Sequence, residues 1–333
     1  MKKIFLFTIL LLVLIPISFS TAQSIPSDTN NAGVTLAISP ENPEPGQSFA
    51  VTVESFTYDL DRSSISWLVN GSLKKTGLGI KTFNYQAGKN GEKTDISIEI
   101  TTPDNQKIIS SVSFITSNID LITEALSYTP PFYKGKALNP NQGTVLIVAI
   151  PNFYNTNKTK VSTQNIVYTW KKDGTVLGSQ SGLGRNTLMI NGSVPIRDIN
   201  IEVSATTADN SITSSKNITV TNTSPKIIFY EDSPIYGVMF NKAITKTVNL
   251  LSDEFKVNAY PYFFNVGYTT SSNLNYTWSM NGSTIPNLDQ VNSMLFRQDK
   301  KGSGSANVGL KIENTSRIFQ FVEDSFNMIF QKQ

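Results

Sequence analysis

Carboxylates and aromatic rings are the side chains of this chain with the clearest capacity for chemistry, because the sequence contains no histidine and no cysteine. That composition excludes Ser-His-Asp and Cys-His nucleophilic catalysis, histidine-bound zinc and thiolate metal sites. Paired carboxylates could still perform acid–base chemistry. The acidic residues are scattered, however, and pairs such as Glu231-Asp232 and Asp253-Glu254 are typical of solvated loops. The sequence therefore predicts a protein that is not an enzyme and needs no cofactor.

Asp59 and Asp61 are the only candidates for a metal site that the sequence offers. They flank Leu60 in a loop before a predicted strand and could give two oxygen ligands to calcium. Calcium requires about six to eight oxygen ligands, and later parts of the chain do not repeat this Asp-x-Asp pattern. A solvated polar loop is therefore favoured, and no metal is predicted.

Two aromatic clusters are the candidates for contact with a ligand or partner. Their members are Phe132, Tyr133, Tyr260, Tyr262, Phe263 and Phe264. One interpretation is that they seal junctions between modules, which is favoured because both clusters lie near predicted module ends. The other is an exposed aromatic patch that binds a partner protein or a glycan.

A tryptophan followed by Asn-Gly or Asp-Gly occurs three times, at intervals of about 100 residues. The copies are Trp67 with Asn70-Gly71, Trp170 with Asp173-Gly174, and Trp278 with Asn281-Gly282. Each tryptophan closes a short alternating run, and the following dipeptide suits a two-residue hairpin turn with positive φ. The pattern predicts a strand, a tight turn and a second strand, with the tryptophan filling a sandwich core.

Further matches extend the repeat into whole modules. Gly77-Leu78-Gly79 corresponds to Gly182-Leu183-Gly184, and the alternating run 95–100 corresponds to 198–203. Period-two alternation predicts antiparallel sheets with one buried and one solvated face. We expect an all-β chain of three tandem antiparallel β-sandwiches, with modules at 33–117, 118–223 and 224–333. Without cysteine, each module must be stabilised by its hydrophobic core alone.

The N-terminus has the pattern of a secretory signal peptide at residues 1–22. Lys2 and Lys3 precede an apolar run from residue 4 to 17, and Ser20-Thr21-Ala22 offers a cleavage site before Gln23. An uncleaved membrane anchor is the alternative, but the apolar run is shorter than the ~20 residues that span a bilayer. We expect an exported protein at the cell surface, in the envelope or outside the cell, without a membrane span in the mature chain.

The balance of charge gives no case for binding nucleic acid. The chain has 28 Lys and Arg residues against 25 Asp and Glu residues, for a formal net charge of +3. Nucleic-acid binding needs a clustered basic face to neutralise phosphates. The predicted partners are therefore other surface or envelope proteins, with a glycan as the alternative.

The run from Ser39 to Phe49 resembles the opening of bacterial immunoglobulin-like modules. The Trp-x-x-x-Gly hairpin and the Gly-x-Gly resemble immunoglobulin-like and PKD-type modules of bacterial surface proteins. The resemblance implies immunoglobulin-like sandwiches, which serve as spacers, adhesin stalks, binding modules or appendages of enzymes, and fold alone does not choose among these.

Short linkers at 116–118 and 221–225 predict an elongated chain with limited bending. The leading hypothesis is an exported, non-enzymatic structural or adhesive scaffold that acts through protein contacts, in a surface filament or secretion complex. The alternative is a polysaccharide-binding protein that uses an aromatic patch.

Overall fold

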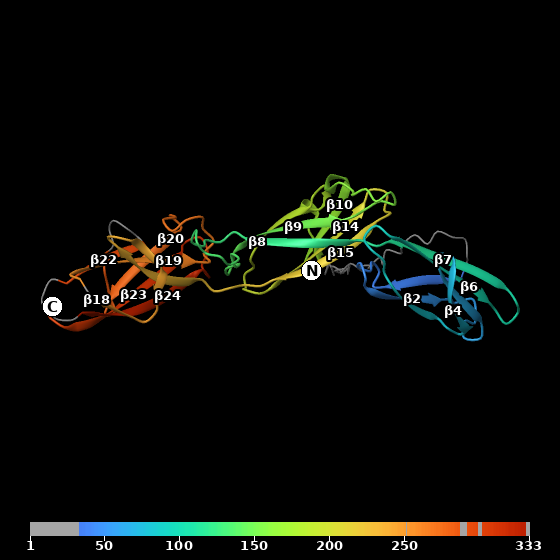
Figure 1. Ribbon diagram of the computed structural model, residues 1–333, viewed down its shortest axis with the longest axis horizontal. Helices are drawn as coiled ribbons and strands as arrows, with labels where there is room; N and C mark the ends of the chain where they lie inside the picture. Colours follow the sequence, from blue (N-terminus) through green and yellow to red (C-terminus); the bar gives the residue numbers. More distant parts are fainter. Residues whose placement is uncertain (1–32, 251, 287–291, 299–301, 331–333) are drawn as a thin grey trace, which may run out of the picture. The chain divides into compact units, whose positions relative to one another are not determined.

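The computed structural model describes residues 33–250, 252–286, 292–298 and 302–330, and this part of the chain is built of β-strands (Figure 1). Its only helices are two short 3₁₀ turns, η1 (Thr163–Asn165) and η2 (Gly178–Gln180). The all-β prediction is confirmed. The predicted signal peptide lies outside the described residues.

Each sheet draws its strands from one of three consecutive stretches of the chain. In the first stretch, one sheet has the order β1-β2-β5 and the other the order β4-β3-β6-β7. The bounds are β1 (Thr35–Ser39), β2 (Ser48–Glu54), β3 (Ser64–Val69), β4 (Ser72–Leu78), β5 (Thr82–Gln86), β6 (Lys93–Thr101) and β7 (Lys107–Ile115).

The second stretch repeats this arrangement with the orders β13-β9-β8 and β11-β10-β14-β15, and β12 pairs with β10. The bounds are β8 (Asn118–Ala125), β9 (Thr144–Asn152), β10 (Ile166–Lys172), β11 (Thr175–Val176), β12 (Gly182–Leu183), β13 (Thr187–Asn191), β14 (Ile199–Thr207) and β15 (Thr213–Val220). The strands of each of these two stretches thus divide between two sheets, as in immunoglobulin-like sandwiches.

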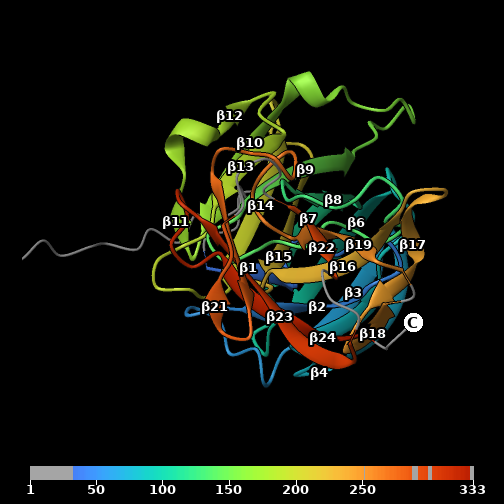
Figure 2. The same cartoon turned by 90° about the vertical axis from the view of Figure 1, so that its left-hand side faces the viewer.

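The third stretch has the sheet orders β17-β16-β19-β22 and β18-β24-β23-β20-β21. The bounds are β16 (Lys226–Ser233), β17 (Gly237–Ile244), β18 (Thr247–Leu250), β19 (Glu254–Tyr262), β20 (Leu274–Met280), β21 (Ser283–Thr284), β22 (Ser293–Arg297), β23 (Gly304–Asn314) and β24 (Phe321–Phe330). Strand β18 runs parallel to β24, a pairing that the repeat pattern did not predict (Figure 2). It covers an edge of β24 that would otherwise have unpaired backbone groups.

The chain divides into two compact units that cut across these stretches. One comprises Val51–Phe83 and Asp95–Val112 with the described residues up to Ala37. The other comprises Ile38–Ala50, Asn84–Thr94 and the remainder from Ser113. The module boundaries expected from the sequence stay a prediction.

The tryptophans lie at the centres of the buried faces. All three side chains are fully buried, and each is opposite an aliphatic residue of the neighbouring strand. These pairs are Trp67 with Ile98, Trp170 with Val203, and Trp278 with Leu310. The indole Nε1 of Trp67 donates to the Ile80 carbonyl at 2.9 Å, and that of Trp170 donates to Arg185 at the same distance. Burial therefore leaves neither of these polar groups without a partner.

The three hairpin turns have the backbone that their dipeptides favour. Both residues of each turn have positive φ: Asn70 50° and Gly71 75°, Asp173 49° and Gly174 81°, Asn281 48° and Gly282 81°. These values match the turn type that follows the twist of antiparallel strands.

The first turn residue also forms a clamp to the strand beyond the hairpin. Its side-chain Oδ1 accepts a backbone N–H there, and its own N–H donates to the carbonyl of the same residue. The pairs are Asn70 with Asp95, Asp173 with Asn200, and Asn281 with Asn307, at 2.8–3.0 Å. This clamp explains why the position holds Asn or Asp in all three copies, beyond the φ requirement alone.

Truncation of Trp170 to alanine tests the role of the core tryptophan. We expect the free energy of unfolding to fall by about 3–5 kcal/mol, because a fully buried aromatic side chain is removed from a packed core. Urea denaturation of the chain from Gln23 onward, followed by circular dichroism, measures the loss.

The matched control is Asp173→Asn in the adjoining turn. Asparagine keeps the Oδ1 acceptor, as Asn70 and Asn281 show, and removes only the partly exposed ion pair with Arg197. The expected change is below about 1 kcal/mol. Equal losses for the two variants would contradict the central role of the tryptophan.

Candidate functional site

The aromatic residues singled out in the sequence come together within the second unit, but not as an exposed row. Tyr262, Phe263 and Phe264 are buried, whereas Tyr260 and Tyr133 are half-buried and Phe132 is 40 % exposed. Strand β19 ends at Tyr262, and a positive φ of 61° at Phe263 turns the chain inward. The interpretation of Tyr262, Phe263 and Phe264 as an exposed binding surface is thereby corrected.

The rings pack edge-on or tilted against one another. Tyr133 meets Tyr262 with ring centroids 5.6 Å apart and Phe263 at 5.9 Å. Phe132 lies 3.6 Å from Phe240 on β17, and Phe240 in turn contacts Tyr260 at 5.2 Å. The three edge-on contacts, with ring centroids 5.2–5.9 Å apart, are favourable beyond the burial of area. The segment Pro130–Lys134 thus packs on the sheet of β16, β17 and β19.

The sequence pattern did not predict two members of this cluster, Tyr230 and Phe240. Tyr230 lies on β16, with its hydroxyl 3.3 Å from that of Tyr262, and Phe240 lies on the adjoining strand β17. The missed signal was Gly237, which has a φ of 69° and stands between two apolar runs as expected for a hairpin turn.

Backbone pairing reinforces the aromatic packing. The N–H of Tyr128 donates to the Phe264 carbonyl at 2.7 Å, and the N–H of Phe263 donates to the Tyr128 carbonyl at 2.9 Å. Close by, Oδ1 of Asn265 accepts the N–H of Thr144 at 2.9 Å. Together with the aromatic cluster, these bonds form what we call the aromatic joint, between residues 128–144 and 260–265.

Gln320 is the polar centre of the aromatic joint, and its side chain is fully buried at 0 % exposure. Its Oε1 accepts the N–H of Asn265 and Nδ2 of Asn314, each at 2.9 Å. Its Nε2 donates to the Asn141 carbonyl at 2.7 Å. One buried amide therefore connects three segments that are distant in sequence.

The hydroxyls of Tyr128 and Tyr262 remain protonated in neutral solution. Burial raises the pKa of Tyr128 to about 12 and raises that of Tyr262 further above its ordinary value. Neither phenol can thus supply an anionic base or nucleophile near neutral pH. The joint is equipped to pack and to hydrogen-bond.

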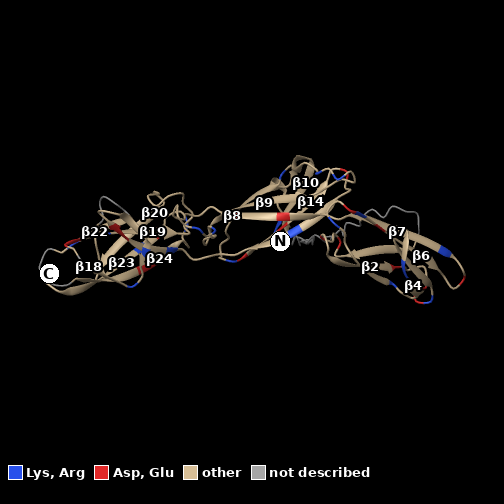
Figure 3. Ribbon diagram, in the orientation of Figure 1, with Lys and Arg blue, Asp and Glu red and all other residues tan. Residues whose placement is uncertain are grey.

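The two candidate calcium ligands are engaged in ion pairs within the first unit. Asp59 accepts Nε of Arg62 at 2.8 Å, and this hydrogen bond lowers the pKa of the Asp59 carboxyl. Asp61 pairs with Lys81 at 2.9 Å. In the described parts of the chain, no group of three or more acidic, histidine or cysteine residues could hold a metal ion. Acidic and basic residues are interspersed along the strands (Figure 3).

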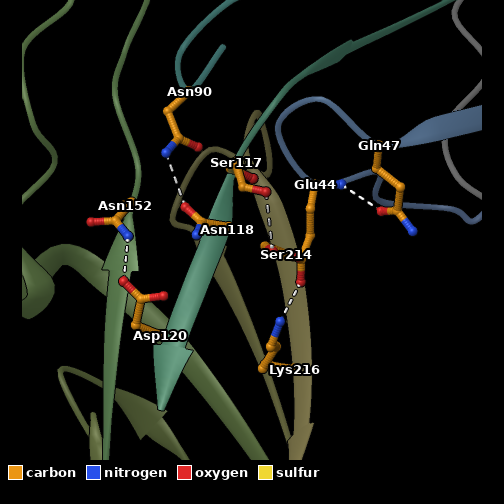
Figure 4. A network of polar contacts seen from close by, with 9 residues as sticks. All are labelled: Glu44, Gln47, Asn90, Ser117, Asn118, Asp120, Asn152, Ser214 and Lys216. Carbon is orange, nitrogen blue, oxygen red and sulfur yellow. Dashed lines mark hydrogen bonds and ion pairs between the residues drawn. The ribbon is translucent and has the colours of Figure 1, made fainter. Parts of the chain in front are cut away.

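A second polar network lies elsewhere in the second unit (Figure 4). Glu44 accepts Nζ of Lys216 at 2.7 Å, and Nδ2 of Asn90 donates to Oδ1 of Asn118 at 3.0 Å. Ser117 is buried, and its hydroxyl donates to the Thr213 carbonyl at 3.2 Å. The linker expected at 116–118 is thus hydrogen-bonded to its surroundings.

The sequence matches no protein-family profile and no curated protein. Solved structures with similar features include the central fibronectin-III array of RIM-binding protein, at 14 % identity, 92 % of this chain, 99 % of that one and a TM-score of 0.29. Fibronectin(III)-like modules of Clostridium thermocellum CbhA are 15 % identical, with 57 % of this chain and 94 % of that one covered and a TM-score of 0.28. A structure from a 1.5-MDa bacterial ice-binding adhesin is 11 % identical, with 91 % of this chain and 100 % of that one covered and a TM-score of 0.23.

In the part of the chain that the structure describes, neither helical turn is long and apolar enough to cross a membrane.

Gln320→Ala tests the aromatic joint. We expect a loss of about 2–3 kcal/mol in the free energy of unfolding, because buried polar partners at Asn265, Asn314 and Asn141 lose their hydrogen bonds. Gln106→Ala is the matched control, since Gln106 ends the corresponding turn of the first stretch but is exposed. Chemical denaturation of both variants measures the difference, and similar small losses would contradict the role of Gln320.

Gln320→Glu adds a pH dependence with a defined sign. Burial without a cation should raise the folded pKa of the new carboxyl above the ~4.3 of the unfolded chain. Destabilisation is then smallest below the unfolded pKa and grows as the pH rises above it. Denaturation of the variant and the unmodified chain from pH 3.5 to 7.5 measures this loss of stability. A loss that does not increase with pH would contradict the burial of position 320 and show that it is hydrated.

Proposed function

We propose that this chain is an exported, non-enzymatic protein of the cell surface or envelope that serves as a structural or adhesive scaffold through protein contacts. The absence of histidine and cysteine supports it, as does the successive arrangement of sandwich sheets. The PKD-type resemblance and the module boundaries at 33–117, 118–223 and 224–333 belong to the same proposal.

The observation that carries the proposal is the aromatic joint. A flexible linker would leave consecutive sandwiches free to reorient, whereas here Gln320 and the buried rings bind one set of sheets to the next within the second unit. Extensive burial of aromatic and amide groups at a junction suits a protein that maintains the spacing of its parts.

Protein contacts could be made by apolar side chains at loop and hairpin ends. Phe56 is fully exposed in the loop after β2, and Ile235 and Tyr236 are exposed at the turn between β16 and β17. Aromatic residues such as Phe and Tyr are enriched at protein interfaces. The alternative is a protein that binds polysaccharide through an aromatic patch. Tyr262, Phe263 and Phe264 cannot form that patch, because their side chains are buried.

Small-angle scattering tests the extended arrangement that the short linkers predict. A single compact globule of the length of the mature chain would have a radius of gyration of about 20 Å. We expect a clearly larger value for the monomeric chain beginning at Gln23. A value near that of the compact globule would overturn the scaffold with separated modules.

Fractionation of the native cells tests localisation and retention. We expect the mature protein to begin at Gln23, as N-terminal mass spectrometry would show, and to sediment with the envelope. Washing with high salt should leave it in place if apolar contacts hold it, because salt screens ionic contacts only. Recovery of the whole population as free monomer in the medium would contradict attachment through partners.

A further inference from the structure

A cleft of about 520 Å³ opens beside the aromatic joint, within the second unit. One wall is formed by the end of β8 and the residues that follow it, from Glu124 to Thr129, together with Ala137. The other wall is Asn265, Val266 and Gly267, directly after the buried Phe264. Its volume lies within the roughly 300–1,000 Å³ typical of small-molecule sites.

The lining mixes hydroxyl, amide and carboxylate groups with apolar surface. Polar side chains come from Glu124, Ser127, Thr129 and Asn265, and apolar contact comes from Leu126, which is 42 % exposed, and Val266. Tyr128 adds an aromatic ring. Neither lysine nor arginine lines the cleft, so it offers no cation to an anionic ligand.

Several of these polar groups retain unused hydrogen-bonding capacity. Oδ1 of Asn265 accepts the N–H of Thr144, while its Nδ2 has no protein partner among the described residues. The Glu124 carboxylate likewise has none in the described structure. The hydroxyl of Ser127 donates to the Leu138 carbonyl at 2.8 Å and can still accept a hydrogen bond.

We propose that this cleft binds a neutral saccharide, which goes beyond the scaffold role and does not depend on it. A sugar ring presents hydroxyl groups along its edge and C–H groups on its faces, which matches carboxylate, amide and hydroxyl groups set beside Leu126, Tyr128 and Val266. Glu124 accepts hydroxyl protons, and Nδ2 of Asn265 donates to a sugar oxygen. A negatively charged sugar is disfavoured by the unopposed carboxylate of Glu124.

The test uses the mature chain and titrates it with oligosaccharides of glucose, mannose and N-acetylglucosamine, with an oligogalacturonate as the anionic comparison. Isothermal calorimetry and saturation-transfer NMR report binding. We expect at least one neutral oligosaccharide to bind with a dissociation constant of about 1 mM or tighter, and the oligogalacturonate to bind more weakly.

Asn265→Asp is the decisive variant, because it keeps the Oδ1 acceptor for Thr144 and replaces only the Nδ2 donor. Binding should weaken about tenfold or more. Asn249→Asp makes the same change at an exposed position on β18, outside the cleft, and should leave binding unaltered. Glu124→Gln, at an exposed side chain, should also weaken binding and remains informative if Asn265→Asp impairs folding in thermal melts.

The proposal is overturned if none of the neutral oligosaccharides binds at about 10 mM. It is also overturned if folded Asn265→Asp and Glu124→Gln chains bind as the unmodified protein does, or if the anionic oligosaccharide binds best. None of these results would affect the predicted envelope retention or the scattering profile. The scaffold proposal is therefore tested independently of the saccharide proposal.

Discussion

Burial of alternate side chains is the interaction on which the whole structure depends, since the chain has no cysteine to form a disulfide. In β6, Ile96, Ile98 and Ile100 point to one core, and in β14 Ile199 and Ile201 do the same. A tryptophan sits opposite the middle of each such strand, where it covers the most area. With most of the burial in these faces, loop residues that contact neither a core nor a turn clamp can vary without loss of the fold.

The sequence was sufficient for the all-β class and the three hairpin turns that follow the tryptophans, because these depend on neighbours a few positions apart. The aromatic joint depends on residues far apart in the chain, such as Gln320 and Asn141, and periodicity carries no information about such pairs. Tyr230 and Phe240 were missed for a local reason, because the hairpin turn at Gly237 that joins their strands was not recognised. The clamp at Asn70 could be predicted only in part. The Asn-Gly dipeptide indicates the turn, but the hydrogen bond to Asp95 depends on the register of β3 and β6.

The arrangement also separates two uses of aromatic residues that the sequence could not distinguish. Tyr262 and Phe264 fill space between packed elements, so they contribute to the position of the chain and not to recognition. Exposed side chains such as Phe56 and Tyr236, and the cleft beside Tyr128, are the places to which we assign recognition in our proposals. The joint and the cleft share a segment, so a ligand in the cleft would contact residues from both sides of the junction.

The clamp has a consequence for how the protein ages. Asn-Gly sequences lose their side-chain amide over time, and Asn70-Gly71 and Asn281-Gly282 are two such sites. The second turn already has the corresponding acid, because Asp173 accepts the N–H of Asn200 with the same oxygen that asparagine uses in the other turns. Hydrolysis to normal aspartate would therefore keep each clamp intact, whereas rearrangement to isoaspartate would lengthen the backbone and open it.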